Sequence, residues 1–121
     1  MSAVIIDGKA LGRSIEDGLS ERVAALRERG VTPNLAVVIA GEDPASQVYV
    51  RNKQRACERC GILSTRIDLP STATQDDILE IVVDLNADDS VHGILVQSPA
   101  PEGVDELAVA GAIDPAKDVD G

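Results

Sequence analysis

The spacing of apolar and polar residues along the chain predicts alternating helices and strands. Residues 34–40 form a short, continuous apolar run, which predicts a strand buried on both faces. Residues 63–69 alternate more and predict an exposed or edge strand, and residues 91–97 predict a third strand. Within residues 7–30 an apolar residue recurs every three or four positions, as in the stripe of an amphipathic helix: Leu11, Ile15, Leu19, Val23 and Leu26.

Capping residues set the limits of the helices that separate these strands. Asp43 is a plausible N-cap of a helix that ends at Gly61. Thr74, followed three residues later by Asp77, resembles a capping box and predicts a second such helix. A short helix is expected over residues 104–113. Strands that alternate with helices predict an α/β fold, here one three-layer αβα domain over residues 1–121 with a mostly parallel sheet flanked by helices.

Composition and charge narrow the classes of partner. Apolar residues make up 44% of the chain and aromatic residues 1%, so the core must be aliphatic. A net charge of −10 argues against binding to nucleic acid or to an anionic membrane surface. The chain has no apolar run near the ~20 residues that a membrane span needs, and its first residues lack a secretory signal. We therefore expect a cytoplasmic protein.

The motif Cys57-Glu-Arg-Cys60 could be a redox pair or half of a zinc site. No second pair of cysteines exists, and His92, the only histidine, is distant in sequence. We interpret the two cysteines as small residues that pack a helix face, and we expect no metal.

The helix after the first strand carries the most informative side chains. At about 100° per residue, one face of this helix gathers six residues: Ser46, Tyr49, Val50, Lys53, Cys57 and Cys60. Lys53 thus lies within an apolar stripe, where desolvation would lower its pKa and allow proton exchange near neutral pH. Alternatively, its stem lies along the helix and its amine pairs with a surface acid. Tyr49, the only aromatic residue, could stack on a flat ligand or pack in the core with its hydroxyl bonded.

Ligands of parallel sheets bind at the carboxyl ends of the strands, which places candidate loops after all three strands. Gln97 ends the third strand and could hold the Lys53 amine without adding charge, or it could cap a loop. Asp118 or Asp120 could accept N–H groups of a heterocycle in bidentate fashion, or could serve ordinary turn chemistry. These residues predict a polar pocket with a lysine acid/base, a stacking ring and a neutral helper.

Three segments resemble motifs of one enzyme family. "GEDPASQVYVRNK" resembles Gly-x-x-x-x-Ser-x-x-Tyr-x-x-x-Lys, "GILVQSPAP" resembles Gly-Ile-x-Val-Gln-x-Pro-x-Pro, and "DPAKDVDG" contains Pro-x-Lys-Asp-Val-Asp-Gly. These are motifs of the methylenetetrahydrofolate dehydrogenase/methenyltetrahydrofolate cyclohydrolase family, the FolD-type bifunctional enzymes. Tyr-x-x-x-Lys alone is a weak signal, but the three motifs in this order are highly specific.

The resemblance implies a role in one-carbon metabolism and purine biosynthesis. Family members oxidise 5,10-methylenetetrahydrofolate by hydride transfer to NAD(P), then hydrolyse the methenyl product to 10-formyltetrahydrofolate. By resemblance, Lys53 is the catalytic lysine, Gln97 tunes it, Tyr49 packs against the folate and Asp120 holds the pterin ring. Further substrate contacts are implied at motif positions: Ser46, Val96, Ser98 and Pro99. The family usually has bulky apolar residues where this chain has Ser98 and Ala100, which changes the pocket wall.

The family chain is about twice as long, and its second half is a Rossmann domain that binds NADP. No Gly-x-Gly-x-x-Gly loop follows a strand in this sequence, so we interpret it as the folate-side catalytic domain, which should not bind NADP by itself. A homodimer is expected at full length. The main alternative is a non-catalytic folate-binding or assembly module of the same fold. A short-chain dehydrogenase also uses Tyr-x-x-x-Lys, but residues 1–40 lack the glycine-rich loop that it needs.

Overall fold

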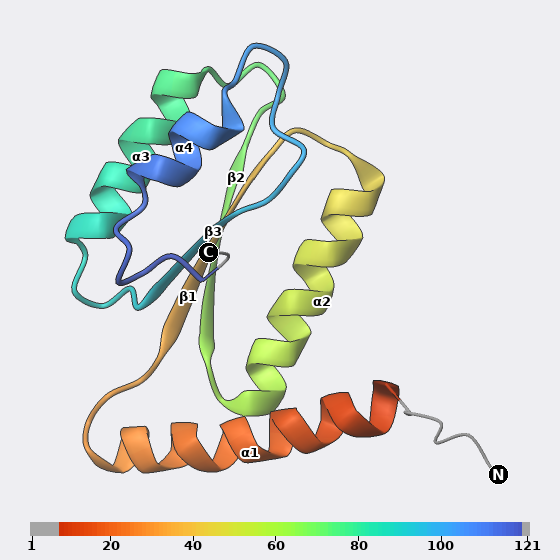
Figure 1. The fold of residues 1–121 in the computed structure, drawn as a ribbon, viewed down its shortest axis with the longest axis vertical. Coiled ribbons are helices and arrows are strands. Elements are labelled where there is room, and N and C mark those ends of the chain that lie inside the picture. Colours follow the sequence, from red (N-terminus) through yellow and green to blue (C-terminus); the bar gives the residue numbers. More distant parts are fainter. Residues whose placement is uncertain (1–7, 120–121) are drawn as a thin grey trace, which may run out of the picture.

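The computed structural model describes the backbone of residues 8–119 and the side chains of residues 14–119. Helices and strands alternate along this part of the chain, as the apolar pattern predicts (Figure 1). The elements are α1 (Gly8–Glu28), β1 (Asn34–Ala40), α2 (Pro44–Cys60), β2 (Leu63–Leu69), α3 (Gln75–Ala87), β3 (Gly93–Val96) and α4 (Glu106–Ala112). The predicted bounds of β1 and β2 are confirmed, whereas β3 and α4 are shorter than predicted.

The three strands form a parallel sheet in the order β2-β1-β3. Because β1 is the central strand, its side chains are buried on both faces of the sheet, and β2 is an edge strand, as predicted. Helix α2 covers one face, and α3 and α4 cover the other (Figure 1). The prediction of a three-layer αβα domain is therefore confirmed.

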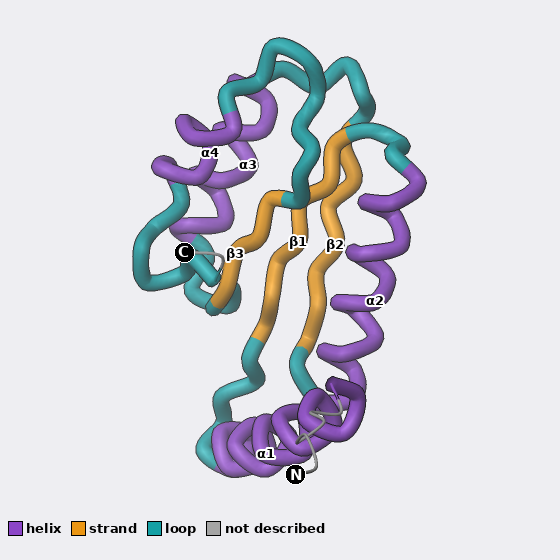
Figure 2. The backbone as a smooth tube through the Cα atoms, turned by 45° about the vertical axis from the view of Figure 1, so that its right-hand side comes forward, coloured by secondary structure: helices purple, strands orange, loops and turns teal. Residues whose placement is uncertain are grey.

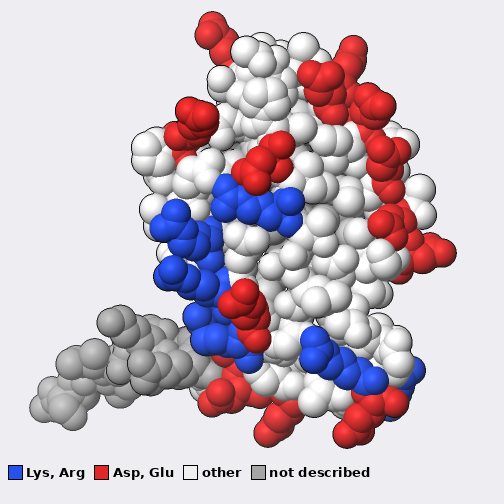
Figure 3. Space-filling model, turned by 180° about the vertical axis from the view of Figure 1, so that it is seen from behind, with Lys and Arg blue, Asp and Glu red and all other residues white. Residues whose placement is uncertain are grey.

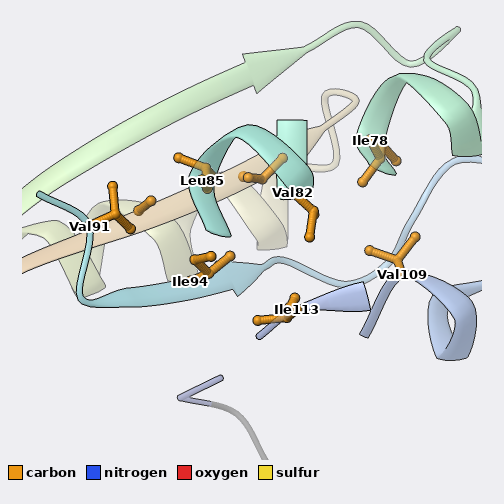
Figure 4. Packing of buried hydrophobic residues seen from close by; sticks show 9 residues of the cluster. Ile78, Val82, Leu85, Val91, Ile94, Val109 and Ile113 are labelled. Carbon is orange, nitrogen blue, oxygen red and sulfur yellow. The ribbon is translucent and has the colours of Figure 1, made fainter. Parts of the chain in front are cut away.

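Alternation along β1 divides the core into two clusters. Val37 and Ile39 point toward α2, where they pack with Val50 and with Leu95 of β3. Ala36 and Val38 point to the other face, where they pack with residues of β3, α3 and α4. This larger cluster (Figure 4) consists of nine buried residues: Ala36, Val38, Ile78, Val82, Leu85, Val91, Ile94, Val109 and Ile113. The core is aliphatic throughout, as the composition requires.

Helix α1 lies across the end of the sheet where the strands begin, and not flat on either face (Figures 1 and 2). It contacts the last turn of α2: Arg59 pairs with Glu16, and the Ser20 hydroxyl donates to the Arg59 carbonyl. The predicted stripe is only partly buried as a result. Val23 is 5% exposed, whereas Ile15, Leu19 and Leu26 are 55%, 38% and 37% exposed.

The caps predicted for α2 and α3 are present. The Asp43 carboxylate accepts hydrogen bonds from the backbone N–H groups of Ala45 and Ser46. Gly61 ends α2 with φ of 77°, a left-handed conformation that favours glycine. Thr74 and Asp77 form a reciprocal capping box at the start of α3. These local signals explain why the helix limits could be read from the sequence.

The segment after α4 returns to the sheet beside β3. The Ile94 N–H donates to the Lys117 carbonyl at 2.7 Å, and Asp118 makes a parallel bridge with Ile94. The Lys117 ammonium donates to the carbonyls of Leu85, Asn86 and Asp88, at distances between 2.7 and 3.0 Å. Lys117 thereby caps the C-terminal end of α3 and holds the returning segment in place.

Charges are segregated on the surface. In the view from behind, Lys and Arg form a column on the side of α2, and Asp and Glu line the side of α3 (Figure 3). Helix α2 has three exposed arginines, Arg51, Arg55 and Arg59. The helix that carries Lys53 has a single acid, Glu58, so the net negative charge of the chain comes from other segments. None of the helices that the structure describes is long and apolar enough to cross a membrane.

Candidate active site

A hydrogen bond between Lys53 and Gln97 lies at the centre of the candidate site. Lys53 is a half-buried residue in the middle of α2, and Gln97 follows the last residue of β3. The Lys53 Nζ donates to the Gln97 Oε1 at 2.7 Å. The Gln97 backbone N–H donates to the Val38 carbonyl at 2.8 Å, which fixes this residue to the central strand. The packing of α2 on the sheet thus brings together two residues separated by 44 positions.

The Ser98 carbonyl fixes the orientation of the Gln97 amide. It accepts hydrogen bonds from the Gln97 Nε2 at 3.1 Å and from the buried Ser46 hydroxyl at 3.0 Å. An ammonium group can only donate, so the Gln97 oxygen must face Lys53 while its NH₂ group faces the carbonyl. The amide has one orientation that satisfies both neighbours. Lys53 therefore faces a neutral acceptor that is held from two sides.

A pocket opens beside Gln97, between the end of β3 and α4. Its floor is apolar and continuous with the core beneath α3 and α4, because Ile78, Ile94 and Val109 belong to both. Its volume of about 230 Å³ lies below the roughly 300–1,000 Å³ typical of pockets that enclose a whole drug-sized ligand. The polar part of its wall comes from four residues: Gln97, Ser98, Glu106 and Asp118. The pocket could take one flat end of a ligand whose remainder lies outside.

Some of the predicted site residues line this pocket, and others lie outside it on α2. Val96, Gln97 and Ser98 line the pocket. Lys53 is not one of its lining residues and is linked to it only through its hydrogen bond to Gln97. Tyr49 is 57% exposed, so the alternative that it packs in the core is wrong. It stands one helical turn from Lys53 on α2, where a ring can meet a ligand from the solvent side.

Two other predicted positions lie at the margin of this site. Ser46 is buried and contacts the loop after β3 through its hydroxyl. Pro99 is exposed, and the peptide bond before it is cis. Asp120 lies outside the residues that the structure describes. Asp118, the other acid considered in the same motif, lines the pocket.

Glu106 is a site residue that the sequence did not reveal. Its carboxylate lines the pocket and accepts a hydrogen bond from the Ala100 backbone N–H at 2.6 Å. It follows Asp105, which caps α4 through the N–H groups of Leu107 and Ala108. In the sequence Glu106 reads as an ordinary acid in the first turn of a short helix, and no spacing rule connects it to the loop before it.

The two cysteines are both buried and unbridged. Burial raises the pKa of the Cys57 thiol, and the neighbouring Cys60 raises it further. A thiol of this kind is a poor nucleophile at neutral pH, in keeping with a packing role. Among residues 14–119, no three His, Cys, Asp or Glu side chains gather where they could hold a metal ion.

The sequence is similar over nearly its whole length to one protein family and to individual members of it. Residues 6–120 match a family described as tetrahydrofolate dehydrogenase/cyclohydrolase, catalytic domain. The bifunctional protein FolD of Chlorobium chlorochromatii is 55% identical over 119 residues, which are 98% of this chain and 40% of that protein. The FolD protein of Halalkalibacterium halodurans is 53% identical over 121 residues, covering 100% and 43% of the two chains. The chain thus spans about 40% of the length of these relatives.

Solved structures give the same relationship. The bifunctional FolD methylenetetrahydrofolate dehydrogenase/cyclohydrolase of Campylobacter jejuni superposes with a TM-score of 0.93 at 45% identity, over 94% of this chain and 40% of its own. A 5,10-methylenetetrahydrofolate dehydrogenase of the silkworm Bombyx mori gives 0.95 at 42% identity, over 99% and 42%. The Trypanosoma brucei enzyme, complexed with NADP cofactor and an inhibitor, gives 0.92 at 39% identity, over 99% and 41%.

Proposed function

The chain belongs to the tetrahydrofolate dehydrogenase/cyclohydrolase family, and we propose that it forms the folate-side half of a bifunctional enzyme of one-carbon metabolism. This enzyme would oxidise 5,10-methylenetetrahydrofolate to the methenyl form and hydrolyse that product to 10-formyltetrahydrofolate. The family match over residues 6–120 supports the substrate class. The bond from Lys53 to Gln97, beside a pocket with an apolar floor, is the observation that carries the proposal.

Hydrolysis of the methenyl form requires movement of protons at two atoms. Water adds to the electrophilic carbon and loses one proton. Cleavage of a carbon–nitrogen bond then moves a proton from the added hydroxyl to the departing ring nitrogen, so that one proton leaves in total. A lysine amine is able to accept a proton from the water and return one to the nitrogen. We assign this role to Lys53.

The role of Gln97 follows from its lack of charge. A carboxylate at the same distance would favour the ammonium form of Lys53 through Coulomb attraction. The amide oxygen orients the amine through a hydrogen bond and adds no fixed negative charge. We therefore assign Gln97 to hold Lys53 in place while leaving it free to exchange its proton.

The remaining site residues would bind the substrate. Tyr49 offers its exposed ring for stacking on the flat part of a folate. Val96, Ser98 and Pro99 would form one wall of the site, and the buried Ser46 would support that wall from α2. Asp120 would accept hydrogen bonds from the pterin, by resemblance of its motif to that of the family.

Oxidation of the methylene form needs a nicotinamide cofactor, which accepts the hydride. In the described part of the chain, no glycine-rich phosphate loop stands between a strand and the helix that follows it. The described residues therefore do not fit this cofactor, and we assign its binding to none of them. We propose that NADP binds to a separate domain, as part of a homodimeric enzyme of the cytoplasm that supplies purine biosynthesis.

The proposal predicts that replacing Lys53 with methionine abolishes hydrolysis. Methionine is unbranched and close in length to the apolar stem of lysine, but it cannot transfer a proton. We expect kcat for methenyltetrahydrofolate hydrolysis in the complete gene product to fall by at least about 10²-fold, the usual contribution of a general acid–base group. Arg51→Met, on the exposed side of the same helix, is the matched control and should retain wild-type kcat. Wild-type turnover by Lys53→Met would refute the assignment.

Calorimetric titration with a folate analogue separates the enzyme from the alternative module. A module that kept the fold but lost the pocket would give no heat at millimolar ligand. A folate-binding module without catalysis would bind the analogue, yet hydrolysis would be equally absent in wild type and Lys53→Met. Binding together with loss of turnover in Lys53→Met supports the enzyme.

A further inference from the structure

Glu106 is hydrogen-bonded to the loop that follows Gln97, the residue that accepts from Lys53. Its Oε1 accepts from the Ala100 backbone N–H at 2.6 Å, and its Oε2 accepts from the Ser98 hydroxyl at 3.4 Å. A backbone N–H that donates to a carboxylate makes one of the stronger hydrogen bonds in proteins. The hydroxyl contact is long and correspondingly weaker. The backbone of Ala100 is therefore the main point at which α4 holds the loop.

The same loop is held from the opposite side of the sheet by α2. There the Ser46 hydroxyl donates to the Ser98 carbonyl, the group that also orients the Gln97 amide. Residues 98–100 thus lie between one anchor on α2 and one on α4. Without Glu106, the Ser98 carbonyl would keep its bond from Ser46, but residues 98–100 would lose their anchor on α4. The Gln97 amide would then lose part of the constraint that aims its oxygen at Lys53.

We infer that Glu106 is a positioning residue for the Lys53–Gln97 pair, which acts through the backbone of residues 98–100 and not by contact with Lys53. The inference rests on the proposed function, because it assigns the loop to the site of that reaction. Glu106 is not needed to cap α4, because the N–H groups of Leu107 and Ala108, which have no acceptor within the helix, already donate to Asp105. The carboxylate of Glu106 is directed back to the loop instead.

Two substitutions separate positioning from a charge effect. Glu106→Gln keeps an oxygen that can accept from the Ala100 N–H, whereas Glu106→Ala removes the acceptor. If Glu106 positions the loop, kcat for methenyl hydrolysis in the complete gene product should fall about tenfold in Glu106→Ala and stay within about threefold of wild type in Glu106→Gln. Small displacements of reacting groups can cost up to 10²-fold. Glu102→Ala removes an exposed acid from the same loop and should leave kcat unchanged.

A nuclear magnetic resonance measurement reads the geometry without relying on turnover. The Ala100 amide proton should shift upfield and exchange faster in Glu106→Ala, and the side-chain NH₂ signals of Gln97 should shift with it. Glu102→Ala should change neither. If the Gln97 signals stay in place, or if Glu106→Gln loses as much activity as Glu106→Ala, the positioning role is wrong. Wild-type kcat in Glu106→Ala also overturns it.

The outcome for Lys53→Met distinguishes failure of the positioning role of Glu106 from failure of the proposed function. If that variant is inactive and Glu106→Ala is not impaired, the positioning role fails and the proposed function stands. If Lys53→Met turns over like wild type, the proposed function fails. Coupled shifts of Ala100 and Gln97 in Glu106→Ala would then still support the geometric link between the two residues.

Discussion

At the scale of single residues, Lys53 and Cys57 lie on the same face of α2 and have different surroundings. Lys53 is half-buried, and its amine donates to the Gln97 amide. The Cys57 side chain is 7% exposed, and its thiol has a raised pKa because burial disfavours the thiolate. One helix face therefore provides both a polar group at the candidate site and an inert group in the core.

The raised pKa of Cys57 predicts a loss of stability at alkaline pH. The unfolded chain ionises this thiol near its ordinary value of about 8.5, whereas the folded chain keeps it protonated to higher pH. The stability is therefore complete below the unfolded pKa and declines as pH rises from there toward the folded pKa. Urea unfolding of wild type and Cys57→Ala at several alkaline pH values should show the smaller decline in the variant.

Native Cys57 should also react slowly with a thiol reagent at neutral pH, because only the thiolate is nucleophilic. Urea-unfolded protein gives the reference rate. Equal rates in the native and unfolded states, or parallel pH dependence of stability in wild type and Cys57→Ala, would contradict the burial argument.

At the scale of elements, the ends of the helices show which contacts are local. The caps of α2 and α3 involve residues two or three positions apart, so the sequence predicts them. The C-terminal end of α3 is different, because its carbonyls accept from Lys117, about 30 residues later. In the sequence, Lys117 is recognisable only as part of a motif, and its capping role depends on the return of the chain to β3.

Lys117→Met is expected to destabilise the protein by about 2 kcal/mol, because hydrogen bonds to a charged group contribute roughly 1.5–3 kcal/mol. The loss should extend to the sheet, since Lys117 also accepts from the Ile94 N–H through its carbonyl. Urea denaturation would measure the change in unfolding free energy, and amide exchange at Ile94 would report local loosening. Lys117→Arg, which keeps the charge and donors, should lose less. Unchanged stability in Lys117→Met would show that water replaces the ammonium without cost.

At the scale of the whole molecule, the position of α1 decides which of its apolar residues matter. The helix crosses the beginning of the sheet and meets the last turn of α2 (Figure 1). Val23 faces Gly61, where an added Cβ would lie 3.3 Å from the valine Cγ1. The other described residues of the stripe remain more than one-third exposed.

Val23→Ala should therefore cost more stability than Leu26→Ala, although leucine is the larger side chain. Removing two buried carbons at about 0.8 kcal/mol each predicts a loss of roughly 1.6 kcal/mol for Val23→Ala, before any cavity term. Leu26→Ala removes three carbons from a side chain that is 37% exposed, so its transfer cost is similar. The buried Val23 also leaves a cavity, whereas water fills the gap at the partly exposed Leu26, so the total loss is expected to be smaller for Leu26. Chemical denaturation of both variants would measure the order. A larger loss for Leu26→Ala would mean that α1 docks through a different face.

The sequence by itself determined the order of elements, the parallel αβα fold, the local caps and the alignment of Lys53 with an apolar helix face. These features depend on apolar periodicity and on interactions between residues a few positions apart, and both can be recognised in the sequence. It also indicated Gln97, because the carboxyl ends of parallel strands are where ligands bind.

Only the tertiary structure decided how α1 docks, which carbonyls Lys117 caps and which acid holds the loop after β3. Each depends on groups brought together by packing, such as the Lys117 ammonium and the end of α3. The contact of Glu106 with Ala100 spans only six residues, but it depends on the path of an irregular loop. The path of this loop follows no repeating pattern of apolar and polar residues, so the sequence does not predict it. It is determined by the contacts of the loop with α2 and α4.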